Sequence, residues 1–310
     1  MGHGGPLSDV SLPPALRAYA GRGPDWAAWL DRLPGVVRDL LAEWELAPDG
    51  AATHGHASVV LPVRTSAGAA VVLKVGFPDP GSEHEALALQ RWHGEAAVRL
   101  LRADPHRRAL LLERLGGEDL GDHWDVQACE VVGGLYGRLH VPAPPQLRTL
   151  SSYADHVAER LAALPHGTPL PPRFVDRARA LARSFAADDA TDGTLVHTDL
   201  HYGNVLRGGD GSWLAIDPQP LSGDPHYEVA PLLWNRFDEL AGRVREGVRD
   251  RFFAAVDAGG LEEERARDWV VVRMLDLARQ RLADPPGTVR ATATADLLTM
   301  SVTIAKAVEA

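Results

Sequence analysis

The hydrophobic pattern of this chain changes its period near residue 116, and this change is the strongest constraint on the fold. Before it, residues 51–115 contain short runs rich in β-branched side chains, which favour strands. After it, apolar residues recur at helical spacing over most of the remaining chain. The segment between the two, GGEDLGDH at residues 116–123, has no periodicity and is rich in glycine, as hinges often are. We therefore predict a two-lobed α+β protein, with lobes at residues 1–115 and 116–310.

The first lobe is expected to contain a small sheet of about five strands with one inserted helix. The turn SAGA, around Gly68, joins two β-rich runs and predicts a hairpin. Four of the strands can be placed along the chain: residues 57–65, 69–77, 97–104 and 108–115.

Two helices are expected in this lobe. Residues 29–46 place their apolar side chains on one face, which predicts an amphipathic helix before the sheet. A second helix is expected over residues 80–94, between the hairpin and the later strands. Its start is indicated by Ser82 followed three residues later by Glu85, the spacing of a capping box.

The second lobe is predicted to be mainly helical. Three short β-rich runs, at residues 194–197, 204–206 and 213–217, surround the polar sequence VHTDLHYGNVL. The only cysteine, Cys129, lies on an apolar helix face and is expected in the core. Helices are expected over residues 124–140, 152–164, 174–187, 229–241, 245–258, 262–282 and 289–308.

Composition excludes several classes of protein. The chain has 310 residues, of which 45% are hydrophobic, and its net charge of −10 disfavours nucleic acid. The charge would suit a cationic small substrate, but simple solubility is the plainer explanation. One cysteine allows no disulfide within the chain. No apolar run reaches the roughly 18 residues of a membrane-spanning helix. The first residues lack the basic and apolar parts of a signal peptide. We expect a cytoplasmic protein without nucleic-acid or membrane partners.

The polar sequence in the second lobe carries a set of oxygen ligands. Asp199 and Asn204 are expected in a loop between short strands, and Asp217 ends the strand that follows. Amide and carboxylate oxygens at Asn204 and Asp217 suit Mg²⁺, which also binds phosphates. Asp199 could then accept a hydrogen bond from a substrate hydroxyl and orient it toward phosphorus. The pattern favours phosphoryl transfer.

Lys74 stands out because it is one of two lysines in the chain and lies in an apolar strand. A buried ammonium group is costly without a partner, so a carboxylate is expected nearby. Glu85 is the nearest candidate and Glu83 is the alternative. In a capping box, however, the Glu85 side chain would bind at Ser82 instead. Paired with Glu85, Lys74 could grip nucleotide phosphates.

These motifs resemble a known family. H-x-D-x-x-x-x-N at residues 197–204 and I-D-P at residues 216–218, with the strand lysine and helix glutamate, resemble the aminoglycoside phosphotransferase branch of the protein-kinase-like fold. The segments HGHASVVLPV, from residue 54, and GDPHYEVAPLLWN, from residue 223, look most similar to its streptomycin 6-phosphotransferase and hydroxyurea phosphotransferase group. The likeness covers roughly residues 30–282. It implies an ATP-dependent kinase for a small molecule.

The resemblance also implies roles for individual residues. Asp199 would be the catalytic base. Asn204 and Asp217 would bind Mg²⁺, and Lys74 with Glu85 would form the ion pair that holds the phosphates.

Three more residues would bind ATP. Ser58 falls in the nucleotide-binding loop, although it could equally be a turn residue. The C=O of Glu113 and the N–H of Leu115 would meet the adenine edge. No activation loop or A-P-E segment follows the I-D-P motif, which argues against a protein substrate.

The implied acceptor is streptomycin or a related aminocyclitol, whose cationic groups need carboxylates once they lose water. The candidates are Asp224, Glu228 and Asp276, with Asp238 and Glu239 as further acidic residues. Asp224 could instead brace its own loop, and Asp276 could pair with a neighbouring arginine. Hydroxyurea, an amino sugar or a secondary metabolite is the alternative acceptor.

Two other functional classes fit parts of the sequence. The pattern H-x-D-x-H, formed by His197, Asp199 and His201, could belong to a metal-dependent hydrolase. In a kinase His197 would hold the loop together, and His201 would either pack in the loop or make a contact in the cleft. A pseudokinase is the second alternative, and the intact set of catalytic residues argues against it.

Overall fold

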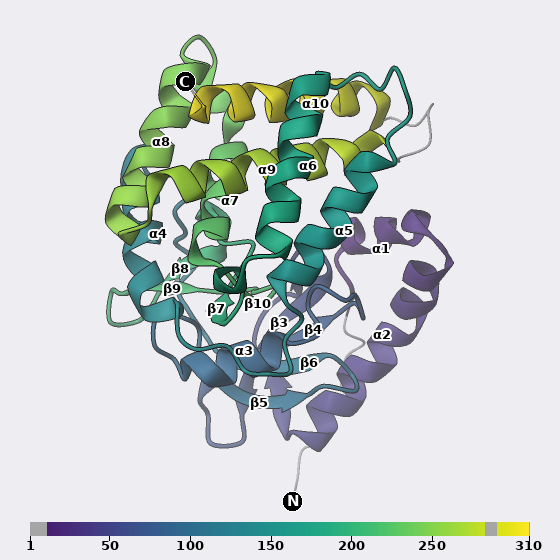
Figure 1. The fold of residues 1–310 in the computed structure, drawn as a ribbon. Coiled ribbons are helices and arrows are strands. Elements are labelled where there is room, and N and C mark those ends of the chain that lie inside the picture. The colour runs from purple at the N-terminus through teal and green to yellow at the C-terminus, as the bar shows by residue number, and fades with distance from the viewer. Residues whose placement is uncertain (1–10, 283–289, 310) are drawn as a thin grey trace, which may run out of the picture. The chain divides into compact units, whose positions relative to one another are not determined.

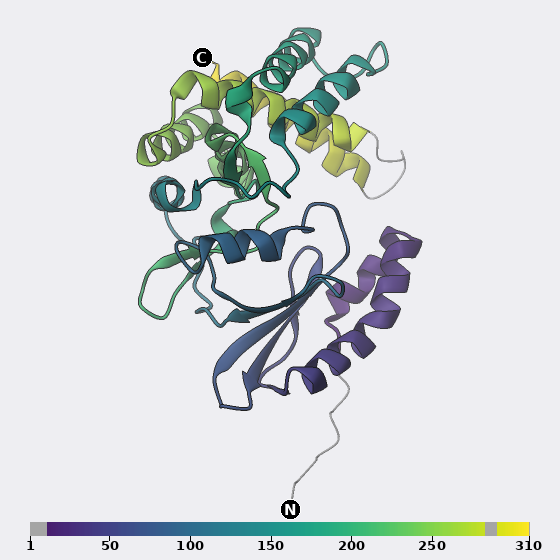
Figure 2. The same cartoon turned by 60° about the horizontal axis from the view of Figure 1, so that its bottom comes forward.

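The computed structural model describes residues 11–282 and 290–309, and the chain divides into two compact units. The first unit is Met1–Gly116 and the second is Gly117–Ala310. Figures 1 and 2 show the course of the chain within each unit. Over the described residues, no helix has both the length and the apolar character needed to cross a membrane.

The first unit is an antiparallel sheet with flanking helices. Five strands follow one another in the order β1-β3-β4-β6-β5, and the two-residue strand β2 pairs with β3 beside this path. The predicted hairpin is confirmed, because β3 and β4 pair along their length. The strands are β1 (Leu46–Pro48), β2 (Thr53–His54), β3 (Ser58–Thr65), β4 (Ala70–Gly76), β5 (Leu100–Asp104) and β6 (Ala109–Glu113). The helices are α1 (Pro14–Arg17), the 3₁₀ helix η1 (Ala18–Arg22), α2 (Pro24–Glu43) and α3 (Glu85–Trp92).

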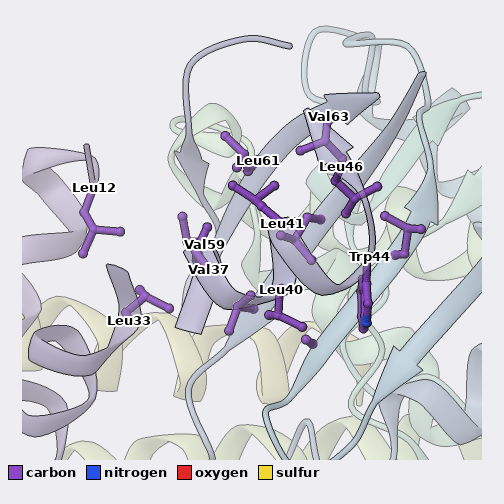
Figure 3. Packing of buried hydrophobic residues seen from close by; sticks show 14 of the residues in the cluster. Leu12, Leu33, Val37, Leu40, Leu41, Trp44, Leu46, Val59, Leu61 and Val63 are labelled. Carbon is purple, nitrogen blue, oxygen red and sulfur yellow. The ribbon is translucent and has the colours of Figure 1, made fainter. Parts of the chain in front are cut away.

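Helix α2 packs its apolar stripe on the sheet, as the sequence predicts. The helix ends earlier than expected, because Glu45 adopts a φ of 53° and this left-handed conformation cannot continue an α-helix. Leu46, expected in the helix, begins β1 instead. Figure 3 shows the cluster that forms between α2, β1 and β3, which includes Leu33, Val37, Leu40, Leu41, Leu46, Val59, Leu61 and Val63.

The predicted capping box at the start of α3 is wrong. The helix begins at Glu85 itself, and its N-cap residue His84 makes no side-chain capping bond. The Ser82 hydroxyl donates a hydrogen bond to the carboxylate of Asp79 at 2.6 Å. Because Glu85 is the first helical residue and not the third, its side chain is available to a partner outside the helix.

The second unit is mainly helical, as predicted. Helices α5 and α6 pack together, as do α9 and α10 (Figure 1). Cys129 is buried in α4, where burial raises the pKa of its thiol to about 12 and leaves it unreactive. The helices are α4 (Asp125–Leu139), α5 (Leu150–Ala162), α6 (Pro172–Ala186), α7 (Ala230–Trp234), α8 (Val244–Gly259), α9 (Glu263–Leu282) and α10 (Arg290–Val308).

The helix predicted over residues 229–241 is broken. Helix α7 ends at Trp234, and the chain resumes as the 3₁₀ helix η5 (Phe237–Leu240). Between them Arg236 has a φ of 55°. Its guanidinium group donates to the backbone carbonyls of Leu120 and His123 at 3.2 and 2.8 Å. These distant contacts, which helical spacing cannot indicate, hold the break in place.

Two pairs of short antiparallel strands position the polar sequence. Strand β7 (Thr194–Val196) pairs with β10 (Leu221–Gly223), and β8 (Val205–Arg207) pairs with β9 (Trp213–Ala215). The sequence predicts three of these strands and misses β10, whose three residues show no alternation. We call the segment between β7 and β8, residues 197–204, the catalytic loop. The pairing brings this loop next to residues 216–220, which connect β9 to β10.

Candidate active site

Lys74 and Glu85 form a buried ion pair in the first unit. Lys74 Nζ lies 2.6 Å from Glu85 Oε1, and the two side chains are only 9% and 8% exposed. The alternative partner Glu83 is 48% exposed and lies 3.8 Å from Arg108. Glu85 is therefore the partner of Lys74. Removing one member of such a pair leaves the other charge buried, which typically costs about 3–5 kcal/mol.

The three residues predicted to bind the nucleotide also lie in the first unit. Ser58 is the first residue of β3 and is buried, and its C=O accepts the N–H of Gly55 at 3.0 Å, which closes the turn before the strand. Glu113 ends β6, where its carboxylate accepts the N–H of Arg99 at 2.7 Å. Leu115 follows the strand and is half-buried. Their contacts with a nucleotide remain predictions.

His197 anchors the catalytic loop of the second unit. Its ring is fully buried, with Nε2 at 2.9 Å from the C=O of Ile216 and Nδ1 at 3.3 Å from the N–H of Asp199. A carbonyl can only accept and an N–H can only donate, so the two partners assign the neutral tautomer with its proton on Nε2. Because His197 uses both ring nitrogens on the backbone, it has none to offer a metal.

Glu228 holds the backbone just before Asp199. It is 1% exposed, and its two carboxylate oxygens accept the N–H groups of His197 and Thr198, the latter at 3.1 Å. Burial opposes its ionisation, but the nearby His140 ring and the backbone N–H of His197 outweigh that effect, so the pKa of Glu228 lies below its usual value. The prediction that Glu228 binds the acceptor is therefore wrong, since both of its oxygens are occupied inside the protein.

Thr198 is strained, and its neighbours hold it. Its φ of 67° is unusual for a β-branched residue. Its N–H donates a hydrogen bond to Glu228, and its C=O accepts a hydrogen bond from the Arg273 guanidinium group at 2.9 Å. Strain of this kind persists where surrounding contacts over-determine the backbone, and it is often found in active sites. Sequence analysis missed both residues, because Thr198 stands at an unspecified position of the motif H-x-D and Arg273 lies outside the motif.

Asn204 and Asp217 lie at the same end of the β8–β9 hairpin. The Ile216 N–H donates to the C=O of Asn204 at 2.9 Å, which places Asp217 next in the chain. The Asn204 side-chain nitrogen donates to the C=O of Asp199 at 2.8 Å, so its Oδ1 is the atom left for a ligand. Asp217 has a φ of 59° and is half-buried. One amide oxygen and one carboxylate fit Mg²⁺, which keeps waters and takes other ligands from phosphates.

His201 is a neutral residue of the catalytic loop. Its Nδ1 accepts the N–H of Gly203 at 3.2 Å, and burial lowers the pKa of its ring despite the nearby Asp199 carboxylate. Across the described parts of the chain, no group of three or more His, Cys, Asp or Glu side chains is arranged to hold a metal ion. The hydrolase interpretation therefore lacks the ligand set it needs.

The two other acidic residues proposed for the acceptor are also committed inside the protein. Asp224 is 1% exposed, and its oxygens accept hydrogen bonds from Arg265, from Trp269 at 2.7 Å and from the His226 backbone at 3.0 Å. Asp276 is equally buried, and it accepts from three side chains. These donors are the Tyr153 hydroxyl at 2.6 Å, Arg279 at 2.8 Å and Gln280 at 2.7 Å. The alternative interpretations therefore describe the structure: Asp224 braces its own loop, and Asp276 pairs with an arginine.

Comparison with known proteins identifies the family. Residues 43–282 match the aminoglycoside/hydroxyurea antibiotic resistance kinases. The chain belongs to this family. A streptomycin 6-kinase from Streptomyces glaucescens is 38% identical over 289 residues, which cover 89% of this chain and 92% of that protein. A hydroxyurea phosphotransferase from Kitasatospora aureofaciens is 41% identical over 261 residues, which cover 80% of this chain and 72% of that protein. The predicted family and its kinase activity are confirmed.

Solved structures share the fold of this family member. An amicoumacin kinase, in complex with AMP-PNP, Ca²⁺ and Ami, aligns with a TM-score of 0.61 at 15% identity and covers 90% of this chain and 95% of its own. The aminoglycoside phosphotransferase APH(4)-Ia, in a ternary complex with ADP and hygromycin B, aligns with a TM-score of 0.57 at 17% identity, over 87% and 97% of the two chains. The predicted protein-kinase-like fold is confirmed.

Proposed function

We propose that this protein transfers the γ-phosphoryl group of ATP to a hydroxyl group of an aminoglycoside or aminocyclitol similar to streptomycin, and thereby gives antibiotic resistance. The observation that carries the proposal is the geometry of the catalytic loop. There Asp199 is held beside Asn204 and Asp217, whose oxygens suit a metal bound to phosphates. Family membership supports the same reaction. In this proposal residues 1–115 bind the nucleotide, and residues 116–310 carry the base and the acceptor.

Asp199 acts as the catalytic base. The acceptor hydroxyl donates a hydrogen bond to the Asp199 carboxylate, which directs the hydroxyl oxygen toward the γ-phosphorus. A new P–O bond forms while the bond from the γ-phosphorus to the β–γ bridging oxygen breaks. The hydroxyl proton passes to Asp199, and the electron pair of the broken bond leaves with ADP.

Cationic groups compensate the charge on the phosphates. Asn204 Oδ1 and the Asp217 carboxylate would hold Mg²⁺, which neutralises phosphate charge when it is bound. Lys74 supplies a second positive charge. Its position depends on Glu85, because the ion pair fixes the direction of an otherwise flexible side chain.

The first unit would bind the nucleotide through three further residues. Ser58, the first residue of β3, would contact a phosphate. The backbone of Glu113 and Leu115, at the end of β6, would hydrogen-bond to adenine. We propose a cytoplasmic location, where ATP is available to the enzyme.

A cationic acceptor agrees with the net charge of −10, because an acidic surface attracts cations. The carboxylates that contact it remain to be assigned, since Asp224, Glu228 and Asp276 are buried. Glu239 pairs with Arg236 at 2.7 Å. Asp238 is exposed and makes no side-chain hydrogen bond or ion pair within the described residues, so it is the remaining member of the proposed set.

Hydroxyurea is the second candidate acceptor, and the 41% identity with a hydroxyurea phosphotransferase favours it. Hydroxyurea is small and neutral, so it needs no carboxylates for charge compensation.

An ADP-release assay with ATP and Mg²⁺ tests these proposals. Streptomycin, hydroxyurea and an uncharged sugar are compared, with Asp199→Asn as the matched inactive control and mass spectrometry to detect one added phosphate. We expect streptomycin to be phosphorylated and the variant to be inactive. If hydroxyurea is the only acceptor that is phosphorylated, the kinase assignment stands and hydroxyurea replaces streptomycin as the proposed acceptor. No phosphorylated product from any acceptor would refute the proposed function.

A further inference from the structure

Gln219 ties the connection after β9 to the catalytic loop. Its backbone N–H donates to the C=O of His197 at 3.0 Å. Its own C=O accepts a hydrogen bond from the Thr198 hydroxyl at 2.7 Å. Both polar groups of its backbone are therefore bound to the two residues that precede Asp199. The backbone from which the Gln219 side chain extends is therefore held next to the backbone that leads into Asp199.

The side chain of Gln219 reaches Asp199 itself. Gln219 Nε2 lies 3.3 Å from Oδ2 of Asp199. The other oxygen, Oδ1, makes no hydrogen bond to any described residue. A distance of 3.3 Å is at the long end for a hydrogen bond, as is common for catalytic contacts before substrate binds. Gln219 is exposed, so core packing does not explain why its side chain lies on this carboxylate.

We propose that Gln219 is a positioning residue for phosphoryl transfer, which rests on the function proposed above. The terminal torsion of an aspartate is broad, so an unrestrained carboxylate can rotate about it. A donor bound to Oδ2 stops this rotation and leaves Oδ1 of Asp199 directed at the acceptor hydroxyl. Loss of a hydrogen bond to a charged group typically changes a rate or an equilibrium by about tenfold or more. Loss of the donor should therefore lower kcat by about tenfold or more.

Two substitutions separate this role from a structural one. Gln219→Leu removes the donor and keeps a side chain of similar size. Gln219→Glu has nearly the same shape and places a carboxylate against Asp199. Glutamate offers Asp199 no amide donor and sets a like charge beside it. Gln219→Glu should therefore lose at least as much kcat as Gln219→Leu does.

The experiment measures kcat and KM for ATP with the acceptor that the ADP-release panel identifies. The control is Gln127→Leu, which alters an exposed glutamine of α4 that has no side-chain hydrogen bond within the described residues. We expect Gln219→Leu to lose about tenfold in kcat with KM for ATP changed less than twofold, and Gln127→Leu to match wild type.

Two results would overturn the inference while the kinase assignment stands. One is a Gln219→Leu variant whose kcat stays within about twofold of an active wild type, below the loss expected for such a bond. The other is a Gln219→Glu variant whose kcat equals that of the wild type. Failure of the proposed function is recognised differently, because wild-type protein would then phosphorylate no acceptor, and the inference would fail with it.

Discussion

The substitution Glu228→Gln tests whether a buried carboxylate holds the catalytic loop. Glu228 accepts the backbone N–H groups of His197 and Thr198, and these two residues precede Asp199. Glutamine has the same shape, but only one of its two terminal atoms can accept a hydrogen bond. The amide nitrogen would face one of the two N–H groups, donor against donor, at a site that excludes water.

The magnitude follows from the bonds that are lost. One hydrogen bond to a charged acceptor contributes about 1.5–3 kcal/mol, and an unsatisfied buried donor adds about 1–3 kcal/mol. The lowered pKa of Glu228 indicates that the fold favours the ionised carboxylate in spite of burial. Replacing it by a neutral amide therefore gains little free energy from the removal of a buried charge. We expect a loss of about 3–5 kcal/mol. In a unit of this size, 1 kcal/mol shifts Tm by about 2–4 °C, so Tm should fall by about 6–20 °C.

Thermal unfolding of wild type and variant at several pH values measures this loss. A carboxylate with a lowered pKa stabilises the fold above its unfolded pKa, near 4.5, and that stability is lost as pH falls through the folded value. The Tm difference should therefore be full at neutral pH and shrink below about pH 4.5. A displacement of about 1 Å at Asp199 should also reduce kcat by about 100-fold.

The control for this experiment is Glu239→Gln, which breaks the exposed ion pair with Arg236. Glu239 is 49% exposed, and pairs of this kind contribute less than about 1 kcal/mol. If Glu228→Gln lowers Tm no more than this control does, the buried carboxylate does not support the loop and our reasoning is refuted.

Three further predictions concern the chemistry. Asp199→Asn should keep its Tm and its affinity for ATP while kcat falls by several orders of magnitude, and a kcat within about tenfold of wild type would contradict the role of the base. Asp217→Ala should abolish Mg²⁺-dependent turnover, whereas His201→Ala should keep its Mg²⁺ dependence. Isothermal titration with Mg²⁺·ATP distinguishes the two variants, and loss of metal binding in His201→Ala alone would favour the metal-dependent hydrolase again. KM for a cationic acceptor should increase with salt while KM for ATP, held through Lys74, changes less; equal sensitivity would argue against carboxylates at the acceptor.

Periodicity in the sequence predicts the order of helices and strands well, and it fails where a distant contact decides the backbone. The segments around Glu45 and Arg236 have apolar residues at helical spacing, yet both residues adopt a left-handed conformation that ends the helix. At Arg236 the cause is visible in its bonds to Leu120 and His123, more than a hundred residues away in the chain. No local pattern contains that information.

The catalytic motif could be identified from the sequence because its spacing is short and its chemistry is specific. Within it, the sequence could not choose between Glu83 and Glu85 as the partner of Lys74. The choice depends on which carboxylate the fold buries: Glu85 is 8% exposed and Glu83 is 48% exposed. A buried ammonium group needs a buried partner, so burial decides the pairing.

The sequence assigns the acidic residues after the I-D-P motif to the acceptor because it shows charges and not their partners. Helix α9 supplies some of these partners, because its residues Arg265, Trp269 and Arg273 are spaced four residues apart and therefore share a face. The first two donate to Asp224, and Arg273 donates to the carbonyls of Tyr227 and Thr198.

This row of donors is the signal that could have corrected the assignment. Two arginines and a tryptophan on one helical face need acceptors when they are buried, and a nearby acidic loop supplies them. A carboxylate that binds a soluble cation must instead be exposed before the ligand arrives. The contacts of a cationic acceptor are therefore to be sought among exposed acids such as Asp238, and Asp238→Asn should raise KM for the acceptor and leave KM for ATP unchanged.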